Sequence, residues 1–243
     1  MNILHMSGFS NVGPIYRREL RSYFNSPVAY VVIIVFLAII GWFFSNNLFL
    51  INVASMRVVF DLVPLVFLFF IPAITMRLLA EEKKSGTLEL LTTRPVRDVE
   101  IVLGKFLACW TLLAAALAPT LIYLITLLAL GSPDIGPVIA GYLGLLLMGG
   151  VYIAIGLFAS SLTENQIIAF IVGFLIVLAL YLADKVLMYV PQSLASILEF
   201  LAIDYHFSSI ARGVIDSRNI IYFASVLGFA LTLATVSLQR RKW

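Results

Sequence analysis

Charged residues are scarce in this sequence. They make up 12% of its 243 residues, against about 25% in an average soluble domain, while 62% of the residues are apolar. The mean hydropathy is +1.05. Because a soluble interior of this size could not bury so much apolar surface, a water-soluble globular domain is excluded and lipid is the expected solvent.

Cysteine and histidine are also rare, which limits the chemistry of the chain. Cys109 is the single cysteine, so no disulfide can form within the chain. His5 and His206 are the only histidines and predict no metal site. A phosphate-binding P-loop is missing, since Gly104–Phe106 lacks the upstream glycine and ends in phenylalanine. We therefore expect no metal, cofactor or catalysis in this chain.

Ionisable residues are nearly absent from the middle of the apolar runs. Asp61, Asp184 and Lys185 lie near the ends of such runs, where water or lipid headgroups reach them. Ion-driven transporters usually place ionisable groups at mid-membrane depth. The chain therefore either performs no ion-driven transport or takes its energy from another protein. The small net charge of +3 predicts no nucleic-acid partner.

The apolar runs themselves predict an all-α integral membrane protein with a single transmembrane domain over residues 1–243. Each run lies between charged residues and most are long enough to cross a bilayer. The first begins late and lacks a small-residue cleavage site, so we interpret it as a retained span. The six predicted spans are residues 28–50, 58–79, 103–130, 137–160, 166–189 and 219–239.

Two of these spans leave an alternative open. Pro64 and Pro72 interrupt the second span, which can be kinked or re-entrant. The fourth span carries many small residues, which permit close helix packing either within the chain or between subunits. These residues are Gly141, Gly144, Gly149, Gly150, Ala154, Gly156 and Ser160.

The basic residues predict the orientation. With the N-terminus inside, 12 Lys and Arg residues fall on the inner side and 4 on the outer side, out of 16 in total. This distribution obeys the positive-inside rule, so we expect both termini to be cytoplasmic.

Residues 12–27 predict an N-terminal helix that lies in the headgroup region. Its aromatic and apolar residues recur at helical spacing and its arginines fall on the opposite side. An ordinary basic flank that fixes topology is the alternative. The residues concerned are Tyr16, Arg17, Arg18, Leu20, Arg21, Tyr23 and Phe24.

The segment 80–100, with its extension to Lys105, is the only sizeable polar loop on the inner side. Ser85-Gly86 can start a short helix with an apolar leucine patch, and Asp98 can cap a second helix that continues into the third span. An exposed apolar patch among charges indicates a protein partner or the membrane surface. A solvated hairpin between two spans is equally compatible with the pattern.

The outer segment 190–218 is too long for a turn and too mixed for a span. Its apolar stretch Ser193–Ile203 and the aromatic residues that follow predict a short, partly re-entrant helix before the last span.

Residues 80–108, AEEKKSGTLELLTTRPVRDVEIVLGKFLA, resemble the signature loop of type-2 ABC transporter permeases, in particular the gliding-motility-associated (GldF-like) group. YRRELRSYFNSPVAY resembles the entry helix of that family, FFIPAITMRLLAEE its second span and YHFSSIARGVIDSRNIIYF its outer segment. The resemblance implies a type V exporter-like fold in which two six-span subunits form a path and each binds a cytoplasmic ATPase. Carried over residue by residue, it assigns ATPase coupling to Glu81, Glu82, Gly86, Thr87, Leu88, Glu89, Leu90, Leu91, Pro95, Gly104 and Lys105.

The resemblance implies a permease subunit of an ATP-driven exporter, with an ATPase, membrane lipid and a second copy or a paralogous six-span subunit as partners. A mechanotransmission subunit that drives a periplasmic auxiliary protein and moves no substrate is the alternative. A membrane-embedded enzyme or anchor is the third, and the lack of a catalytic cluster argues against the enzyme.

The orientation can be tested by cysteine labelling. We expect cysteine at Ser7 or Gln239 to react from the cytoplasmic side, and cysteine at Asn52 or Ser193 to react from the outside, because of the asymmetry of the basic residues. Labelling of Asn52 only after the inner face is opened would invert the topology.

Overall fold

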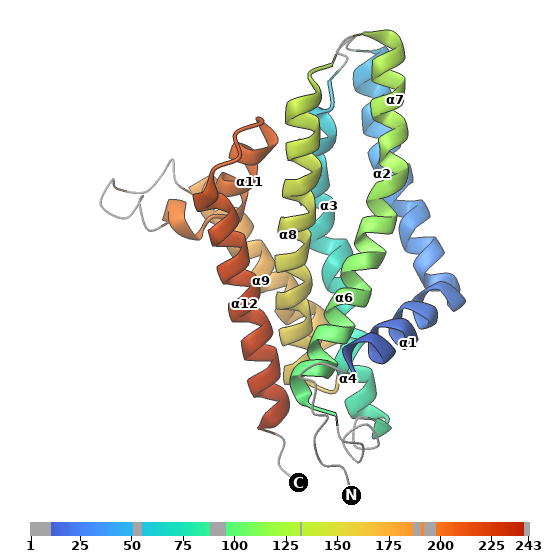
Figure 1. Ribbon diagram of the computed structural model, residues 1–243, viewed down its shortest axis with the longest axis vertical. Helices are drawn as coiled ribbons and strands as arrows, with labels where there is room; N and C mark the ends of the chain where they lie inside the picture. The colour runs from blue at the N-terminus through green and yellow to red at the C-terminus, as the bar shows by residue number, and fades with distance from the viewer. Residues whose placement is uncertain are drawn as a thin grey trace, which may run out of the picture.

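The computed structural model describes residues 11–50, 55–87, 96–131, 133–186, 191 and 198–240, and over these residues it contains helices and no strand (Figure 1). Six helical stretches are long and apolar enough to cross a membrane. The predicted all-α fold with six spans is therefore confirmed.

The chain runs up and down along one bundle. The short oblique helix α1 and the end of α12 lie at one end, which we call the terminal end, and α3, α8 and α12 begin at the other, the far end (Figure 1). The helices are α1 (Val12–Asn25), α2 (Pro27–Phe49), α3 (Arg57–Thr75), α4 (Arg77–Lys84), α6 (Asp98–Leu117), α7 (Leu121–Leu130), α8 (Ile135–Leu162), α9 (Gln166–Val186), α11 (Ile203–Ala211) and α12 (Ser217–Gln239), with a 3₁₀ turn η1 (Ala118–Thr120).

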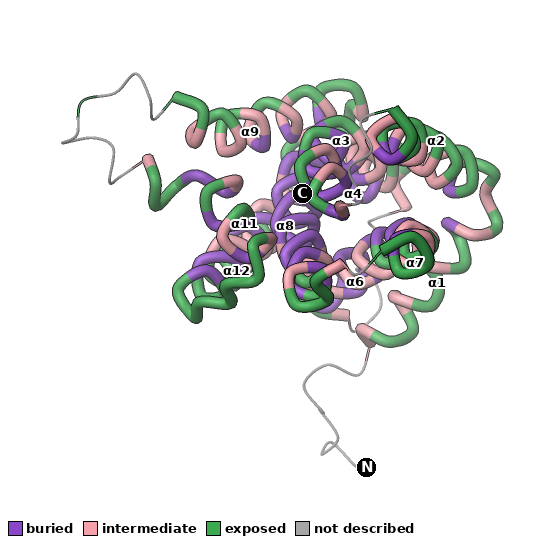
Figure 2. The backbone as a smooth tube through the Cα atoms, turned by 90° about the horizontal axis from the view of Figure 1, so that it is seen from above, coloured by how far each residue is buried: buried purple, intermediate pink, exposed green. Residues whose placement is uncertain are grey.

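Helix α8 is the core of the bundle. Figure 2 shows it as the buried centre, with exposed faces on α2, α9 and α12 around it. Its small residues are used within the chain, because a Cβ on Gly141 would lie 2.5 Å from the Phe60 ring and a Cβ on Gly156 would overlap Thr75. Of the two alternatives for this span, packing inside one chain accounts for these contacts.

The second span is kinked and crosses the bundle in two helices, α3 and α4, separated at Met76. Pro64 and Pro72 lie inside α3, and each removes one helical N–H donor. Thr75, next to the break, donates its hydroxyl hydrogen to the Ile71 carbonyl at 2.8 Å. The span therefore continues to Lys84, beyond the predicted end at residue 79.

The third span also differs from the prediction. Its helix α6 begins at Asp98, before the predicted span start at residue 103 but next to the predicted start of the helix that continues into this span, and η1 interrupts it at Pro119 before α7. Asp98 is not the N-cap: Arg97 occupies that position, and the Glu100 carboxylate accepts the Arg97 backbone N–H at 2.9 Å. A side chain inside the first turn thus satisfies the helix end that Asp98 was predicted to cap.

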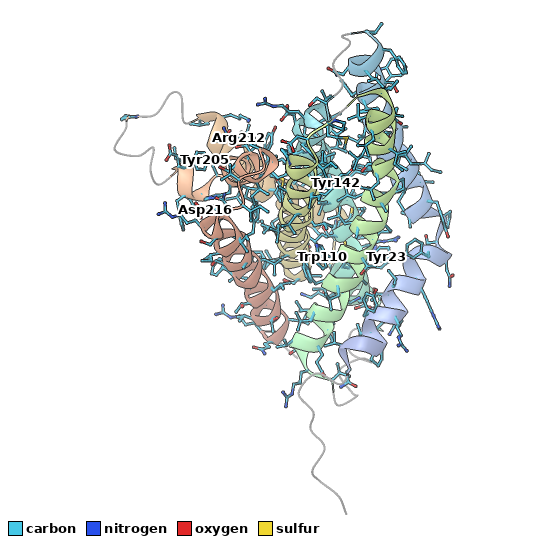
Figure 3. All side chains as sticks on the ribbon, turned by 45° about the horizontal axis from the view of Figure 1, so that its top comes forward. Tyr23, Trp110, Tyr142, Tyr205, Arg212 and Asp216 are labelled. Carbon is cyan, nitrogen blue, oxygen red and sulfur yellow. The ribbon has the colours of Figure 1, made fainter. Side chains whose placement is uncertain are left out.

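In the described part of the outer segment, α11 packs against α8, α9 and α12. His206 on α11 is bonded to Asn219, with 2.8 Å between Nδ1 and Oδ1, and its ring stacks on Tyr222 at 3.9 Å between centroids. These contacts hold α11 to the start of α12, where Figure 3 labels Tyr205, Arg212 and Asp216. Residues 187–190 and 192–197, which include the first five residues of the predicted apolar stretch, lie outside the described residues.

The packing of α8 yields a stability test. Gly156→Ala forces the new methyl group against Thr75, so we expect it to lower the free energy of unfolding by about 1–3 kcal/mol. Gly228→Ala in α12 is the matched control, because its Cβ would meet no atom within 4 Å. Thermal unfolding of both variants in detergent measures the difference. Equal melting temperatures would contradict the close contact between α3 and α8.

Candidate functional site

The residues predicted to act at the inner side gather where α1, α4 and α6 meet, at the terminal end. The structure describes Glu81, Glu82, Gly86, Thr87, Gly104 and Lys105. Five further predicted coupling residues lie outside the described residues: Leu88, Glu89, Leu90, Leu91 and Pro95.

Helix α1 lies against α6 along its aromatic side. Tyr23 is buried, Tyr16 is half-buried and its hydroxyl lies 3.2 Å from the Thr111 hydroxyl of α6. Leu20 and Phe24 are half-buried against the same core, while Arg17, Arg18 and Arg21 are exposed. The predicted division of the helix into two faces therefore holds, but its aromatic side contacts protein instead of lipid acyl chains.

Two further contacts fix α1 on α6. The Glu100 carboxylate accepts both the backbone N–H and the side-chain amide of Asn11, each at 3.1 Å. Gly104 faces Ile15, and a Cβ at Gly104 would lie 2.6 Å from Ile15 Cγ2. Gly104 was predicted to open the third span. It is instead the seventh residue of α6, and its missing side chain lets α1 approach.

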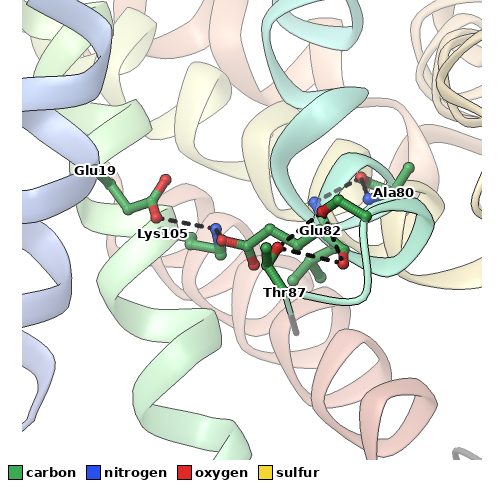
Figure 4. A network of polar contacts seen from close by, with 8 residues as sticks. Glu19, Ala80, Glu82, Thr87 and Lys105 are labelled. Atoms are coloured by element: carbon green, nitrogen blue, oxygen red, sulfur yellow. Dashed lines mark hydrogen bonds and ion pairs between the residues drawn. The ribbon is translucent and has the colours of Figure 1, made fainter. Parts of the chain in front are cut away.

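Lys105 is the centre of the site (Figure 4). Its ammonium group lies 3.1 Å from Glu19 on α1 and 2.9 Å from Glu82 on α4. The Lys105 side chain is 2% exposed, and the carboxylates are 15% and 14% exposed. A buried ammonium ion is tolerated only when paired, so these two contacts tie three helices together through one charge.

Helix α4 ends at Lys84, two residues after Glu82. Gly86 has a φ of +69°, the left-handed conformation that terminates helices, and its N–H donates to the Lys83 carbonyl at 3.2 Å. The Thr87 hydroxyl lies 2.8 Å from that of Ser85 and donates to the Glu82 carbonyl at 3.5 Å. Ser85-Gly86 therefore ends α4. The next residue, Thr87, is again helical, and the rest of the helix predicted to start at Ser85-Gly86 lies outside the described residues.

The start of α4 is held by α8. Ser160 Oγ accepts the backbone N–H groups of Leu79 and Ala80, each at 3.0 Å, and donates to the Met76 carbonyl at 2.9 Å. These are groups that the break between α3 and α4 leaves without an intrahelical partner. Lys83 further donates to the backbone carbonyl of Ser161. One turn of α8 thus positions the whole of α4.

A cavity of about 360 Å³ opens between α1, α4 and α6. Three cationic and three acidic side chains line it: Arg18, Arg77, Lys105, Glu19, Glu81 and Glu82. Tyr23 also lines it, with the Arg77 guanidinium 5.7 Å from its ring centroid. Burial raises the pKa of Tyr23 well above its ordinary value, so its hydroxyl remains protonated at neutral pH.

Sequence reasoning missed Glu19, Glu100 and Ser160. Glu19 carried a usable signal, because it lies at helical spacing from Ile15, Tyr16 and Tyr23, and a carboxylate on an apolar helix face requires a buried partner. Ser160 was noted only as a small residue. Its role as a cap for another helix depends on tertiary packing that the sequence does not display.

The fold is that of a helical membrane protein with several spans. At its terminal end, polar contacts join α4 to α6 and α8, and α6 to α1. The sequence profile of the family described as ABC-2 family transporter protein matches residues 46–208, from the end of α2 into α11. The match covers more than half of the chain, and the chain therefore belongs to this family, the type-2 ABC transporter permeases. No curated protein matches it.

Family membership settles the general role. The chain is a multi-pass transmembrane permease of an ABC transporter, and membrane subunits of this family work with a cytoplasmic ABC ATPase. Such subunits are normally not catalytic.

The junction can be tested at Lys105. Lys105→Met leaves Glu19 and Glu82 buried without a counter-charge, so we expect a loss of about 3–5 kcal/mol in the free energy of unfolding. Unfolding by SDS in mixed micelles measures it. Lys84→Met, an exposed change on the same helix α4, is the control and should cost under about 1 kcal/mol.

A triple variant isolates the electrostatic cause. Glu19→Gln and Glu82→Gln, added to Lys105→Met, remove the unpaired charges and should restore most of the lost stability. A triple variant as unstable as Lys105→Met would show that the lysine acts through packing and not through its two ion pairs.

Proposed function

We propose that this chain couples ATP hydrolysis by a separate cytoplasmic ATPase to export across a bacterial inner membrane, with both termini on the cytoplasmic side. The terminal end is then the ATPase side, and α4 with the segment 80–100 is the region that the ATPase contacts. The resemblance of residues 80–108 to the type-2 ABC transporter permeases supports this assignment, and the likeness to the GldF-like group keeps mechanotransmission open as the alternative.

The observation that carries the proposal is the buried bridge at Lys105. It joins Glu82, inside the segment assigned to the ATPase, to Glu19 on α1. Because Ser160 holds the other end of α4 on α8, a push on segment 80–100 would reach α1, α6 and α8 through direct polar contacts, and α3 through its junction with α4 at Met76. Glu82 and Lys105 act as internal links, whereas the exposed Glu81 is available for contact.

A complete transporter of this kind needs a second six-span subunit, either a second copy or a paralogue. The exposed apolar faces of α2, α9 and α12 would meet either that subunit or membrane lipid. ATP and Mg²⁺ would bind to the partner ATPase, and this chain would hold neither.

Mechanotransmission is the second candidate, and the position of α8 favours it. At the terminal end α8 caps α4 through Ser160, and near the far end its Gly144 lies against Phe207 of α11, in the outer segment. Movement at one end would therefore be passed to the other without a substrate. ATPase activity in vesicles distinguishes the two: stimulation by a transported substrate favours export, and stimulation by a periplasmic protein favours transmission.

The coupling assignment is tested at Leu91, a leucine of the predicted apolar patch. If that patch anchors in an ATPase cleft, Leu91→Arg should abolish co-purification of the ATPase or leave it bound and unresponsive, because a buried anchor is worth about 2–4 kcal/mol. Lys84→Glu, a rim control, should change the complex only slightly and mainly at low salt. Both variants are expressed with the ATPase, and membrane insertion, complex yield and ATP hydrolysis are measured. Parent-like values of all three for Leu91→Arg would make this loop a solvated hairpin.

A further inference from the structure

A second cavity lies at the far end, away from the coupling site. It has a volume of about 600 Å³, a size that suits a small molecule. Its walls are the first turns of α3 and α8, the last turns of α9, and α11. None of the residues that line it takes part in the proposed coupling.

Charge of both signs lines this far-end cavity. The cations are Arg57, Lys185 and Arg212, and the carboxylates are Asp61, Asp134, Asp184 and Asp204. Lys185 is already paired, since its ammonium group lies 2.7 Å from Asp204 and 3.1 Å from Asp184. These three side chains neutralise much of their own charge and join α9 to α11.

The remaining charged groups are not paired in this way. Arg57 and Asp61 attract each other but form no ion pair within 4 Å with any residue that the structure describes. The Arg212 Nε donates to the Ser208 carbonyl at 3.1 Å, which leaves the rest of its guanidinium group for another acceptor. Asp134 accepts the Gly136 N–H at 3.1 Å and retains its second oxygen. The cavity thus offers two guanidinium donors and two carboxylate acceptors.

This arrangement discriminates by charge. A simple anion would be drawn to Arg57 and Arg212 but repelled by the carboxylates, and a simple cation would meet the opposite conflict. A ligand with separated charges satisfies both sets at once. Guanidinium groups favour the multiple oxygens of a phosphate, and carboxylates favour an ammonium group.

We propose that the far-end cavity binds a zwitterion that carries a phosphate and an ammonium group, with the phosphate on Arg57 and Arg212 and the ammonium near Asp61 and Asp134. The cavity lies at the ends of the spans, the depth at which headgroups and water meet. The same chemistry is available from an ethanolamine phospholipid of the adjacent leaflet and from a soluble phosphoethanolamine compound.

Binding is measured on the purified full chain in phosphatidylglycerol nanodiscs, which contain no ammonium group. Calorimetric titration with phosphoethanolamine should give saturable binding, at least tenfold tighter than that of inorganic phosphate or of ethanolamine. Nanodiscs that contain phosphatidylethanolamine form the second arm, in which the lipid should raise the melting temperature of the chain. A response in either arm supports the proposal and identifies the source, and no response in both overturns it.

Variants identify the cavity as the site. Arg57→Gln in the phosphate half and Asp61→Asn in the ammonium half should each weaken binding at least tenfold. Arg212→Gln is a second test of the phosphate half, and because the Arg212 side chain is exposed, this change leaves the core untouched. Arg218→Gln and Glu199→Gln are matched controls in the same outer part of the chain that do not line the cavity, and they should bind as the parent does. Unliganded melting temperatures verify that each variant folds.

Three results would overturn the proposal. They are unchanged binding in the variants of both halves, a loss in the variants of one half alone, and equal binding of phosphate, ethanolamine and phosphoethanolamine. Because no ATPase is present in the assay, the outcome does not depend on the proposed coupling function, and a failure of either leaves the other standing.

Discussion

The terminal end of this protein depends on one buried ammonium group. Lys105 has almost no contact with solvent, so its charge must be balanced within the protein, and Glu19 and Glu82 supply that balance from two other helices. If one of these side chains moved away, a charge would be left unpaired in a site of low dielectric constant, which is unfavourable in free energy. Helices α1, α4 and α6 are therefore constrained to move together, although α1 and α4 are far apart in sequence.

A second constraint comes from α8, which acts on the same junction without charge. Its glycines let α3 and α6 approach closely, since side chains from those helices fill the space where a Cβ would be. The hydroxyl of Ser160 then serves the backbone of α4, whose own helical bonds are interrupted at Met76. The break at Met76 leaves backbone groups without an intrahelical partner and a serine on a neighbouring helix satisfies them, as is required wherever unpaired backbone groups are buried in a membrane protein.

The sequence predicted the parts of this structure that follow from solvent alone. Long apolar runs between charged residues predicted six spans, and helical spacing predicted the two faces of α1. Both patterns reflect whether a side chain faces water or apolar surroundings. The start of α6 was predicted close to Asp98, although its cap was assigned to the wrong residue. The break at Met76 and the cap from Ser160 were not predicted, since both depend on a partner distant in sequence. Lys105 was assigned to ATPase coupling only by resemblance. In the structure its side chain is buried and links α6 to α1 and α4. Glu19 could have been found, because it is the one acid among the arginines of α1 and lies on the apolar side.

The two ends of the protein differ in how they use charge, and the difference bears on what each can do. At the terminal end the charges of Lys105, Glu19 and Glu82 pair with one another and hold α1, α4 and α6 together. At the far end Lys185 performs a similar linking role between α9 and α11, but Arg57, Arg212 and Asp61 remain unpaired around a cavity of about 600 Å³. Since α8 contacts both regions, a ligand that bridges the far-end charges would restrain α3, α8 and α11 relative to one another. This restraint would act on α8, the helix that positions α4. Ligand binding at the far end would therefore change the mobility of the terminal end.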